Sequence, residues 1–274
     1  MSSFARVLED LLTYEKISTQ PGFLQGLEAR AKVVGLMGMV VVVTWVHHLT
    51  TLAAALGASL VLAVASGIPL SRLGRSWLAV PLFSAAIVAP AALNLVTPGR
   101  PLLFLWQSLP SHWGPWSLPP FLAITDAGLV VAARFILRTT ACVTLALLLT
   151  ATTPPARLFR GLRALGVPKL MVMLLSMMER YLGVLLRVAQ EIHLAKLSRS
   201  IAAGSLRAEQ DWVAAGMGAL FRRTQALGNA VYLAMLSRGY TGEVYLLDEP
   251  CWRRRDWGFV GGVVAFGALL LLLG

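Results

Sequence analysis

The sequence predicts an all-α integral membrane protein with about five transmembrane helices and a bundle of long amphipathic cytoplasmic helices. Of its 274 residues, 57% are hydrophobic and 14% are charged, whereas an ordinary soluble domain carries about 25% charged residues. Several stretches lack charged side chains over the length of a bilayer crossing. Between them, residues 152–242 are basic and show the apolar spacing of helices. The chain therefore combines membrane spans with a charged helical insert.

Four segments are expected along the chain. Residues 1–29 form an N-terminal cytoplasmic or interfacial segment, and residues 30–152 hold transmembrane helices 1–4. Residues 153–250 form a cytoplasmic helical domain, and residues 251–274 form a C-terminal transmembrane helix. The first 16 residues contain acids and no long apolar core. They are therefore interpreted as a short amphipathic helix on the inner membrane surface instead of a signal peptide.

The first uncharged stretch runs from Val33 to Ser66. As one helix it would be about 51 Å long, too long for a single crossing of a core about 30 Å thick. His47 and His48 at its middle indicate a hairpin tip, with spans at about 30–47 and 50–67. Small residues in the second span, from Ala53 to Ser59, favour close helix packing.

The next segments alternate between basic, apolar and proline-rich composition. Residues 71–75 are expected to be a basic loop, and residues 77–96 a third span kinked at Pro81 and Pro90. Residues 97–125, rich in proline and tryptophan, are expected to be an outer loop at the membrane interface. A fourth span opens at Asp126 and runs to about Thr150. The final uncharged run, 257–274, carries Gly258 and Gly262 at GxxxG spacing.

The loop charges predict the topology. Residues 157–255 hold 15 of the 24 Lys and Arg residues against 7 of the 13 acids. The loops expected on the same side carry Arg30, Lys32, Arg72 and Arg75, whereas the opposite side carries His47, His48 and Arg100. By the positive-inside rule, the N-terminus and the insert are cytoplasmic. The basic charge alternates with apolar helical positions without interleaved aromatic residues, which argues against a nucleic-acid-binding protein.

Three helices are expected in the insert. A short basic helix at 156–165 ends before Gly166. A second, at about 169–201, has apolar residues three or four positions apart and a length of about 48 Å. A third follows at about 210–238. Six of the nine methionines lie between Met171 and Met235, which indicates either an adaptable binding surface or helix-on-helix packing.

Two short signatures stand at the ends of the long helices. They comprise Ser198, Arg199 and Ser200 in the first and Ser237, Arg238 and Gly239 in the second. Each arginine could present its guanidinium group to a carboxylate on a partner protein. Alternatively, each could complement the negative end of its helix dipole. Because the pattern is repeated with a small residue on each side, partner docking is favoured.

Arg134 and Arg138 lie one turn apart in the fourth span. A cation inside a membrane is costly and usually faces a bundle interior or an aqueous path, so a gate or partner contact is one interpretation. The other is that the side chains extend to the outer headgroups, which we favour for Arg134 and not for Arg138.

No catalytic or metal site is expected. His47, His48 and His112 lack neighbouring acids or cysteines to complete a metal site. The run Glu179, Arg180 and Tyr181 resembles a solvated charged helix face. The sequence contains no phosphate-binding P-loop, no G-x-S-x-G and no H-E-x-x-H motif. If ATP drives this protein, another chain must hydrolyse it.

The quoted motifs resemble a known family. The segments TTPPARLFRGLRALGVPKL, MMERYLGVLL and AVYLAMLSRGYTGE, with LEARAKVVGLM and SGIPLSRLGRSWL before them, are similar to the transmembrane (T) component of energy-coupling-factor transporters. The resemblance is greatest to the cobalt-type CbiQ branch and covers about residues 14–245. The stretch AMLSRGYTG is its most specific part.

The resemblance implies a non-catalytic scaffold without a cofactor, in a prokaryotic plasma membrane. Its partners would be two cytoplasmic ATP-binding subunits and a separate substrate-binding membrane subunit, for uptake of cobalt, nickel or a vitamin. In the family, arginines of two Ala-Arg-Gly signatures on cytoplasmic coupling helices dock into the ATPases, which here implies Arg199 and Arg238. This sequence departs from the pattern at Ser198, Ser200 and Ser237.

Two alternatives remain open. A conventional ABC importer permease would itself line the substrate path and bind substrate without a separate subunit. An intramembrane lipid-modifying enzyme would need a site such as paired acids, but the adjacent acid pairs, Glu9 with Asp10 and Asp248 with Glu249, lie at the membrane margins.

Overall fold

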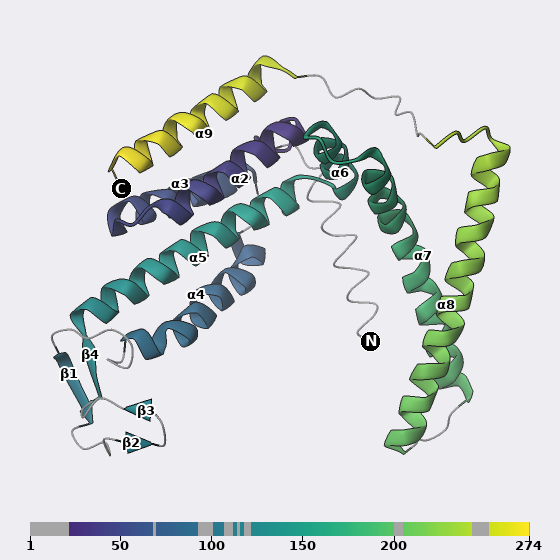
Figure 1. Cartoon of the computed structure of the whole chain (residues 1–274), viewed down its shortest axis with the longest axis horizontal. Helices are drawn as coiled ribbons and strands as arrows, with labels where there is room; N and C mark the ends of the chain where they lie inside the picture. Colours follow the sequence, from purple (N-terminus) through teal and green to yellow (C-terminus); the bar gives the residue numbers. More distant parts are fainter. Residues whose placement is uncertain are drawn as a thin grey trace. The chain divides into compact units, whose positions relative to one another are not determined.

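The computed structural model describes residues 22–67, 70–92, 101–106, 112–113, 116–117, 122–199, 205–242 and 252–273. The predicted N-terminal amphipathic helix lies outside these residues. The described part is helical apart from four short strands, so the helical class predicted from the sequence is confirmed. It forms two compact units: α2 to α5 with α9 and the strands make up one, and α6 to α8 the other (Figure 1).

The first two helices form the predicted hairpin. α2 spans Ala29–Trp45 and α3 spans Leu49–Ala65. Residues 46–48 connect them, with Val46 and His48 in extended conformation. The turn therefore falls at the two histidines, as expected. The small side chains of Ala55, Ser59 and Ala63 are buried along one face of α3, which lets α3 contact α5 closely.

The third apolar helix, α4, spans Leu70–Ala92 and contains Pro81 and Pro90. It begins earlier than predicted, because residues 71–75 are helical instead of forming a loop. That segment contains no proline, and the single Gly74 lowers helix propensity by only about 1 kcal/mol. The basic residues therefore extend the helix beyond its apolar part.

The segment expected to be an outer loop contains two antiparallel strand pairs. β1, Pro101–Trp106, pairs with β4, Leu122–Thr125, and β2, His112–Trp113, pairs with β3, Trp116–Ser117. β4 leads directly into α5. The sequence analysis did not predict these pairings, since the prolines of this segment obscure the alternation that marks a strand.

α5, Asp126–Thr152, is the central helix of the first unit. The Thr125 hydroxyl accepts a hydrogen bond from the Gly128 N–H at 3.3 Å and caps its first turn. α5 contacts α2, α3 and α4, and Figure 1 shows it between the α2–α3 hairpin and α4. Its buried side chains include Leu145 and Leu148. The core of this unit therefore lies around α5.

α9, Arg254–Leu273, packs against α2. The approach is close because glycines lie at the contact. A Cβ atom on Gly35 would lie 2.9 Å from a ring carbon of Phe259, and one on Gly267 would lie 3.3 Å from a methyl carbon of Val42. Among the described residues, nothing lies within 4 Å of a Cβ placed on Gly258 or Gly262, so the GxxxG pair makes no helix contact there.

Apolar side chains also cover the outside of this unit. Large exposed examples are Trp45, Val61, Leu82, Phe83 and Leu272, each more than half exposed. α5 and α9 are long and apolar enough to cross a membrane, whereas α3 and the Ala79–Ala91 part of α4 are apolar but shorter. Lipid can cover such surfaces at no hydrophobic cost, and the number of five spans stays a prediction.

The second unit contains the three helices expected in the insert. α6 spans Pro155–Ala164, α7 spans Lys169–Arg199 and α8 spans Leu206–Ser237. α6 contacts α7, and α7 contacts α8. Gly166, with φ of +99°, ends α6 at the predicted position. Few residues of these helices are buried: Gly161 on α6, two valines on α7 and none on α8.

Candidate partner-docking site

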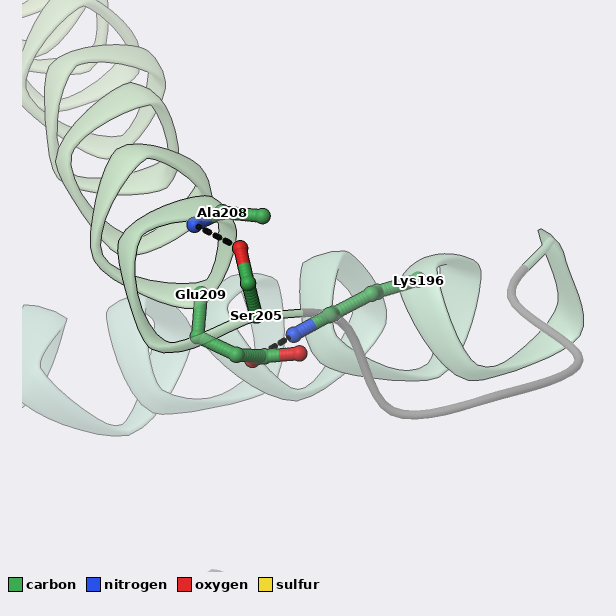
Figure 2. Close-up of polar contacts among 4 residues, drawn as sticks. All are labelled: Lys196, Ser205, Ala208 and Glu209. Carbon is green, nitrogen blue, oxygen red and sulfur yellow. Dashed lines mark hydrogen bonds and ion pairs between the residues drawn. The ribbon is translucent and has the colours of Figure 1, made fainter.

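The α7–α8 pair is joined at one end by a cluster of polar and aromatic side chains. Lys196 of α7 forms an ion pair with Glu209 of α8 (Figure 2). The Lys196 ammonium also lies 4.4 Å from the ring centre of Trp212, which meets His193 edge to face. Ser205 caps α8 by accepting a hydrogen bond from the Ala208 N–H at 3.4 Å (Figure 2). The end of α7 is thereby held against the start of α8.

At the other end of the pair, the end of α8 contacts the start of α7. The Tyr240 hydroxyl, just after α8, donates a hydrogen bond to the Met173 sulfur near the start of α7, at 3.1 Å. The helices therefore run antiparallel, and Arg199 and Arg238 lie at opposite ends of the hairpin. At 1.5 Å per residue, the 32 residues of α8 separate these ends by about 48 Å.

The serines of the two signatures that precede the arginines form the same hydrogen bond. The Ser198 hydroxyl donates to the carbonyl oxygen of Ala195, and the Ser237 hydroxyl donates to that of Ala234, both at 3.0 Å. The shared sequence is longer than the Ser-Arg pair: residues 194–199 read LAKLSR and residues 233–238 read LAMLSR. Both serine hydroxyls thus bond within their own helix.

Exposed leucines accompany each arginine at the same positions. Leu194 and Leu197 on α7 are 62% and 56% exposed, and Leu233 and Leu236 on α8 are 64% and 45% exposed. Each pair is three residues apart, so its members share one helix face. The sequence analysis missed these leucines. A comparison of the two signatures over six residues instead of three would have found them.

Arg238 occupies the C-cap of α8. The Gly239 N–H donates to the Leu236 carbonyl at 3.0 Å and the Tyr240 N–H to the Met235 carbonyl at 3.1 Å, the two bonds of a Schellman motif. That motif requires a left-handed residue after the cap, and Gly239 has φ of +82°. The glycine of the second signature therefore sets where α8 ends.

Both signature arginines are exposed. Arg199 is the last residue of α7, and Ser200 after it lies outside the described residues. Within the described part of the chain, no carboxylate forms an ion pair with either arginine. Each cation stands at the negative end of a helix dipole and also remains available to a carboxylate on another protein. We therefore define each candidate docking surface as the exposed helix end that carries one arginine and its two leucines.

The two intramembrane candidates lie in α5. Arg138 donates from Nη2 to the carbonyl oxygen of Val46, at 2.7 Å, and so lies beside the turn between α2 and α3. Arg134 lies one turn earlier on α5. Both guanidinium groups are partly buried, and the Nε atom of each has no hydrogen-bond partner among the described residues.

The described residues contain no group of three or more His, Cys, Asp or Glu side chains placed to hold a metal ion. His47 and His48 are exposed at the turn, and only the strand position of His112 is described. Between α2 and α9 lies an apolar groove of about 260 Å³, lined by residues such as Met39, Val42 and Val264. It offers no polar groups for chemistry.

Comparisons with known proteins assign the family. The family model described as "Cobalt transport protein" (CbiQ) matches residues 21–246. An uncharacterized protein of Methanocaldococcus jannaschii is 30% identical over 270 residues, which cover 97% of this chain and 88% of that protein. A protein of Methanocorpusculum labreanum named "Putative fused cobalt transport protein CbiMQ" is 29% identical over 178 residues, covering 65% of this chain and 28% of that longer protein.

The family match spans both structural units, from α2 to the residues after α8. It confirms the resemblance derived from the motifs and makes the chain a component of a transporter instead of an enzyme. The family and the long apolar helices α5 and α9 together indicate a membrane protein. The chain belongs to the CbiQ family of cobalt transport proteins.

Proposed function

We propose that this chain is the scaffold subunit of an energy-coupling-factor importer. It transmits the ATP-driven movement of two cytoplasmic ATP-binding subunits to a separate membrane subunit that binds the substrate. α7 and α8 serve as coupling helices, and the N-terminus and these helices face the cytoplasm.

The repeated docking surface carries this proposal. Two copies of the sequence Leu-Ala-x-Leu-Ser-Arg lie at opposite ends of one hairpin and share the serine-to-carbonyl hydrogen bond. Two equal sites suit two similar partners, each of which would supply a carboxylate for the arginine and an apolar pocket for the leucines. A separation of about 48 Å leaves room for one partner at each end.

The proposed mechanism follows from this geometry. When ATP draws the two ATP-binding subunits together, each would pull on one end of the α7–α8 hairpin through Arg199 or Arg238. The cluster of Lys196, Glu209 and Trp212 ties the helices at one end, and the Tyr240–Met173 hydrogen bond ties them at the other. Because both ends are tied, the two helices would move together, and the hairpin would transmit the force instead of separating into two independent helices.

Cobalt is the proposed substrate, with nickel as the close chemical alternative. The proposal draws on the family description and on the relative named a putative fused cobalt transport protein. That name describes a fusion, and this chain matches only part of that protein, which fits a subunit that works with a second membrane chain.

The test replaces both docking arginines. Arg199→Glu with Arg238→Glu reverses the charge at both docking surfaces, and we expect the ATP-binding subunits to be lost from the complex on affinity purification while the chain still inserts in the membrane. The matched control is Arg222→Glu with Arg223→Glu, two exposed arginines of α8 outside the signatures. Equal retention of the ATP-binding subunits by the signature variant and the wild-type chain would overturn the proposal.

A further inference from the structure

α2 and α5 are connected by hydrogen bonds from two cations, one on each helix, and each cation caps the C-terminal end of the other helix. Lys32 of α2 donates from Nζ to the carbonyl oxygen of Thr152, the last residue of α5, at 3.1 Å, and to the Thr153 hydroxyl at 3.4 Å. Arg138 of α5 donates to the carbonyl oxygen of Val46, the C-cap of α2, at 2.7 Å. The helices therefore run antiparallel, and each supplies a cation to the other's C-terminus.

The charges fit the helix ends. The last carbonyl groups of a helix have no partner within it and carry a partial negative charge. Neither α2 nor α5 has a basic residue in its own last turn, so each end depends on the other helix for its cation. Lys32, Val46 and Thr152 are at most 2% exposed. Water therefore cannot replace these bonds, and loss of either leaves a buried polar group unsatisfied.

The spacing of the two contacts sets the alignment of the helices. Lys32 and Val46 are 14 positions apart on α2, and Arg138 and Thr152 are 14 positions apart on α5, which is about 21 Å along either helix. A slide of α2 along α5 would move both cations away from their carbonyls at once. The contacts of the two cations therefore fix the relative position of the helices along their axes.

A buried carboxylate, Asp256, lies at the start of α2. The first turn of α2 contains no acid, and the Asp256 carboxylate of α9 accepts a hydrogen bond from the N–H of Glu28, its N-cap, at 2.9 Å. Its other oxygen accepts from the Arg253 N–H at 2.8 Å. An anion at this helix start again has the sign that the dipole favours, so α9 is tied to the locked pair.

We propose that Lys32 and Arg138 are positioning residues for transport. They make α2 and α5 move as one rigid body. A force on the end of α5 therefore displaces the opposite end of the pair instead of sliding one helix past the other. The force would act at Thr152 and Thr153, which accept hydrogen bonds from Lys32. From these residues the chain continues into α6. This inference rests on the proposed function, since the rigidity of the helix pair affects transport only if the chain transmits movement.

The alignment lock is tested on the purified chain, which requires no partner. Spin labels at Val41 on α2 and Leu129 on α5, both more than half exposed, report the relative position of the helices when Cys142 and Cys251 are replaced by serine. We expect one narrow distance distribution for the wild-type sequence. Lys32→Met with Arg138→Met keeps side-chain bulk but removes both cations, and should broaden the distribution or add a second distance. An unchanged single distance overturns the lock.

The positioning role is tested in the complex with its ATP-binding and membrane partners, as substrate uptake per ATP hydrolysed. For Arg138→Met we expect this ratio to fall about tenfold, the factor that corresponds to one lost hydrogen bond from a charged group. Lys32→Met, which loses two hydrogen bonds, should lower the ratio at least as much. Uptake and hydrolysis should fall together if the residues only maintain folding. Lys32→Arg and Arg138→Lys keep the cations and should restore the ratio, and Arg30→Met is the control for loss of charge on α2.

An unchanged ratio in the methionine variants overturns the positioning role even where the distances broaden. Purification of the wild-type complex distinguishes a failure of the proposed function from a failure of the inference about Lys32 and Arg138. A wild-type chain that does not retain ATP-binding subunits contradicts the proposed function, whereas the lock between α2 and α5 still stands or falls on the measured distances.

Discussion

The carboxylate of Asp256 accepts a hydrogen bond from the backbone N–H of Glu28, although the two residues are 228 positions apart. The side chain is 2% exposed, and its two oxygens hold the N-terminal ends of α2 and α9 together. A buried carboxylate is costly unless it is paired in this way. Asp256 is therefore a structural link between the first and last described helices.

Replacement of Asp256 by asparagine should lower stability by about 1–3 kcal/mol, because the charge is lost and an amide NH₂ would face a backbone donor. For a chain of this size, each 1 kcal/mol corresponds to about 2–4 °C in Tm. The measurement is thermal unfolding in detergent. Asp126→Asn, at an exposed acid of the first turn of α5, is the control. Equal Tm values for both variants would contradict the structural link.

Gly35→Ala should destabilise the α2–α9 contact, whereas Gly258→Ala should not. The added methyl group at Gly35 would lie 2.9 Å from the ring of buried Phe259, while the one at Gly258 would meet nothing within 4 Å. Overpacking of this kind costs about 1–3 kcal/mol. Thermal unfolding of the two variants side by side checks this. A larger loss for Gly258→Ala would mean that the packing faces of α9 are assigned incorrectly.

Gly239→Ala should weaken retention of the ATP-binding subunits without any change to Arg238. Gly239 has φ of +82°, and a side chain in that conformation costs about 1–2 kcal/mol, so the Schellman motif that positions Arg238 would loosen. Gly242→Ala is the control, since Gly242 also has positive φ, at +98°, but follows the motif. The measurement is co-purification at increasing salt. Identical salt profiles for the two variants would show that the cap does not position the arginine.

Leu197→Ser with Leu236→Ser should also weaken retention of the ATP-binding subunits, although both arginines remain. Burial of one leucine contributes about 1.5–3 kcal/mol, so each site should lose at least about tenfold in affinity. Leu182→Ser with Val213→Ser, at exposed apolar positions of α7 and α8 outside the docking surfaces, is the control. A stronger effect of the control pair would place the interface elsewhere on the hairpin.

Local sequence patterns predicted most helix positions. The apolar runs, the histidine pair at the hairpin turn and the glycine after α6 correspond to α2, α3, α5, α6 and α9 within a few residues. Helix periodicity and caps are properties of neighbouring residues, so a single sequence carries them. The secondary structure was predicted wrongly where several weak local signals compete. Examples are residues 71–75, which are helical, and the strand pairs among residues 101–125.

The residues of the proposed docking surfaces stand out in the sequence only in part. The arginines stand out in sequence because a basic residue with small neighbours occurs at two helix ends. The exposed leucines beside them do not, since an apolar residue on an amphipathic helix is equally expected in a core. Their exposure, and the placement of the arginines at opposite ends of an antiparallel hairpin, follow from the packing of α7 and α8.

The sequence by itself determined the helical membrane class, the charged helical insert, the family and the positions of both arginine signatures. Only the tertiary structure decided the hydrogen-bond partners of Lys32, Arg138 and Asp256, which lie 120, 92 and 228 positions away in sequence. In sequence, Lys32 is one more basic residue at a membrane edge, and Asp256 is one acid before an apolar run. Their importance arises from unsatisfied helix ends on other segments, and which helix end lies beside which side chain is settled only when the helices pack.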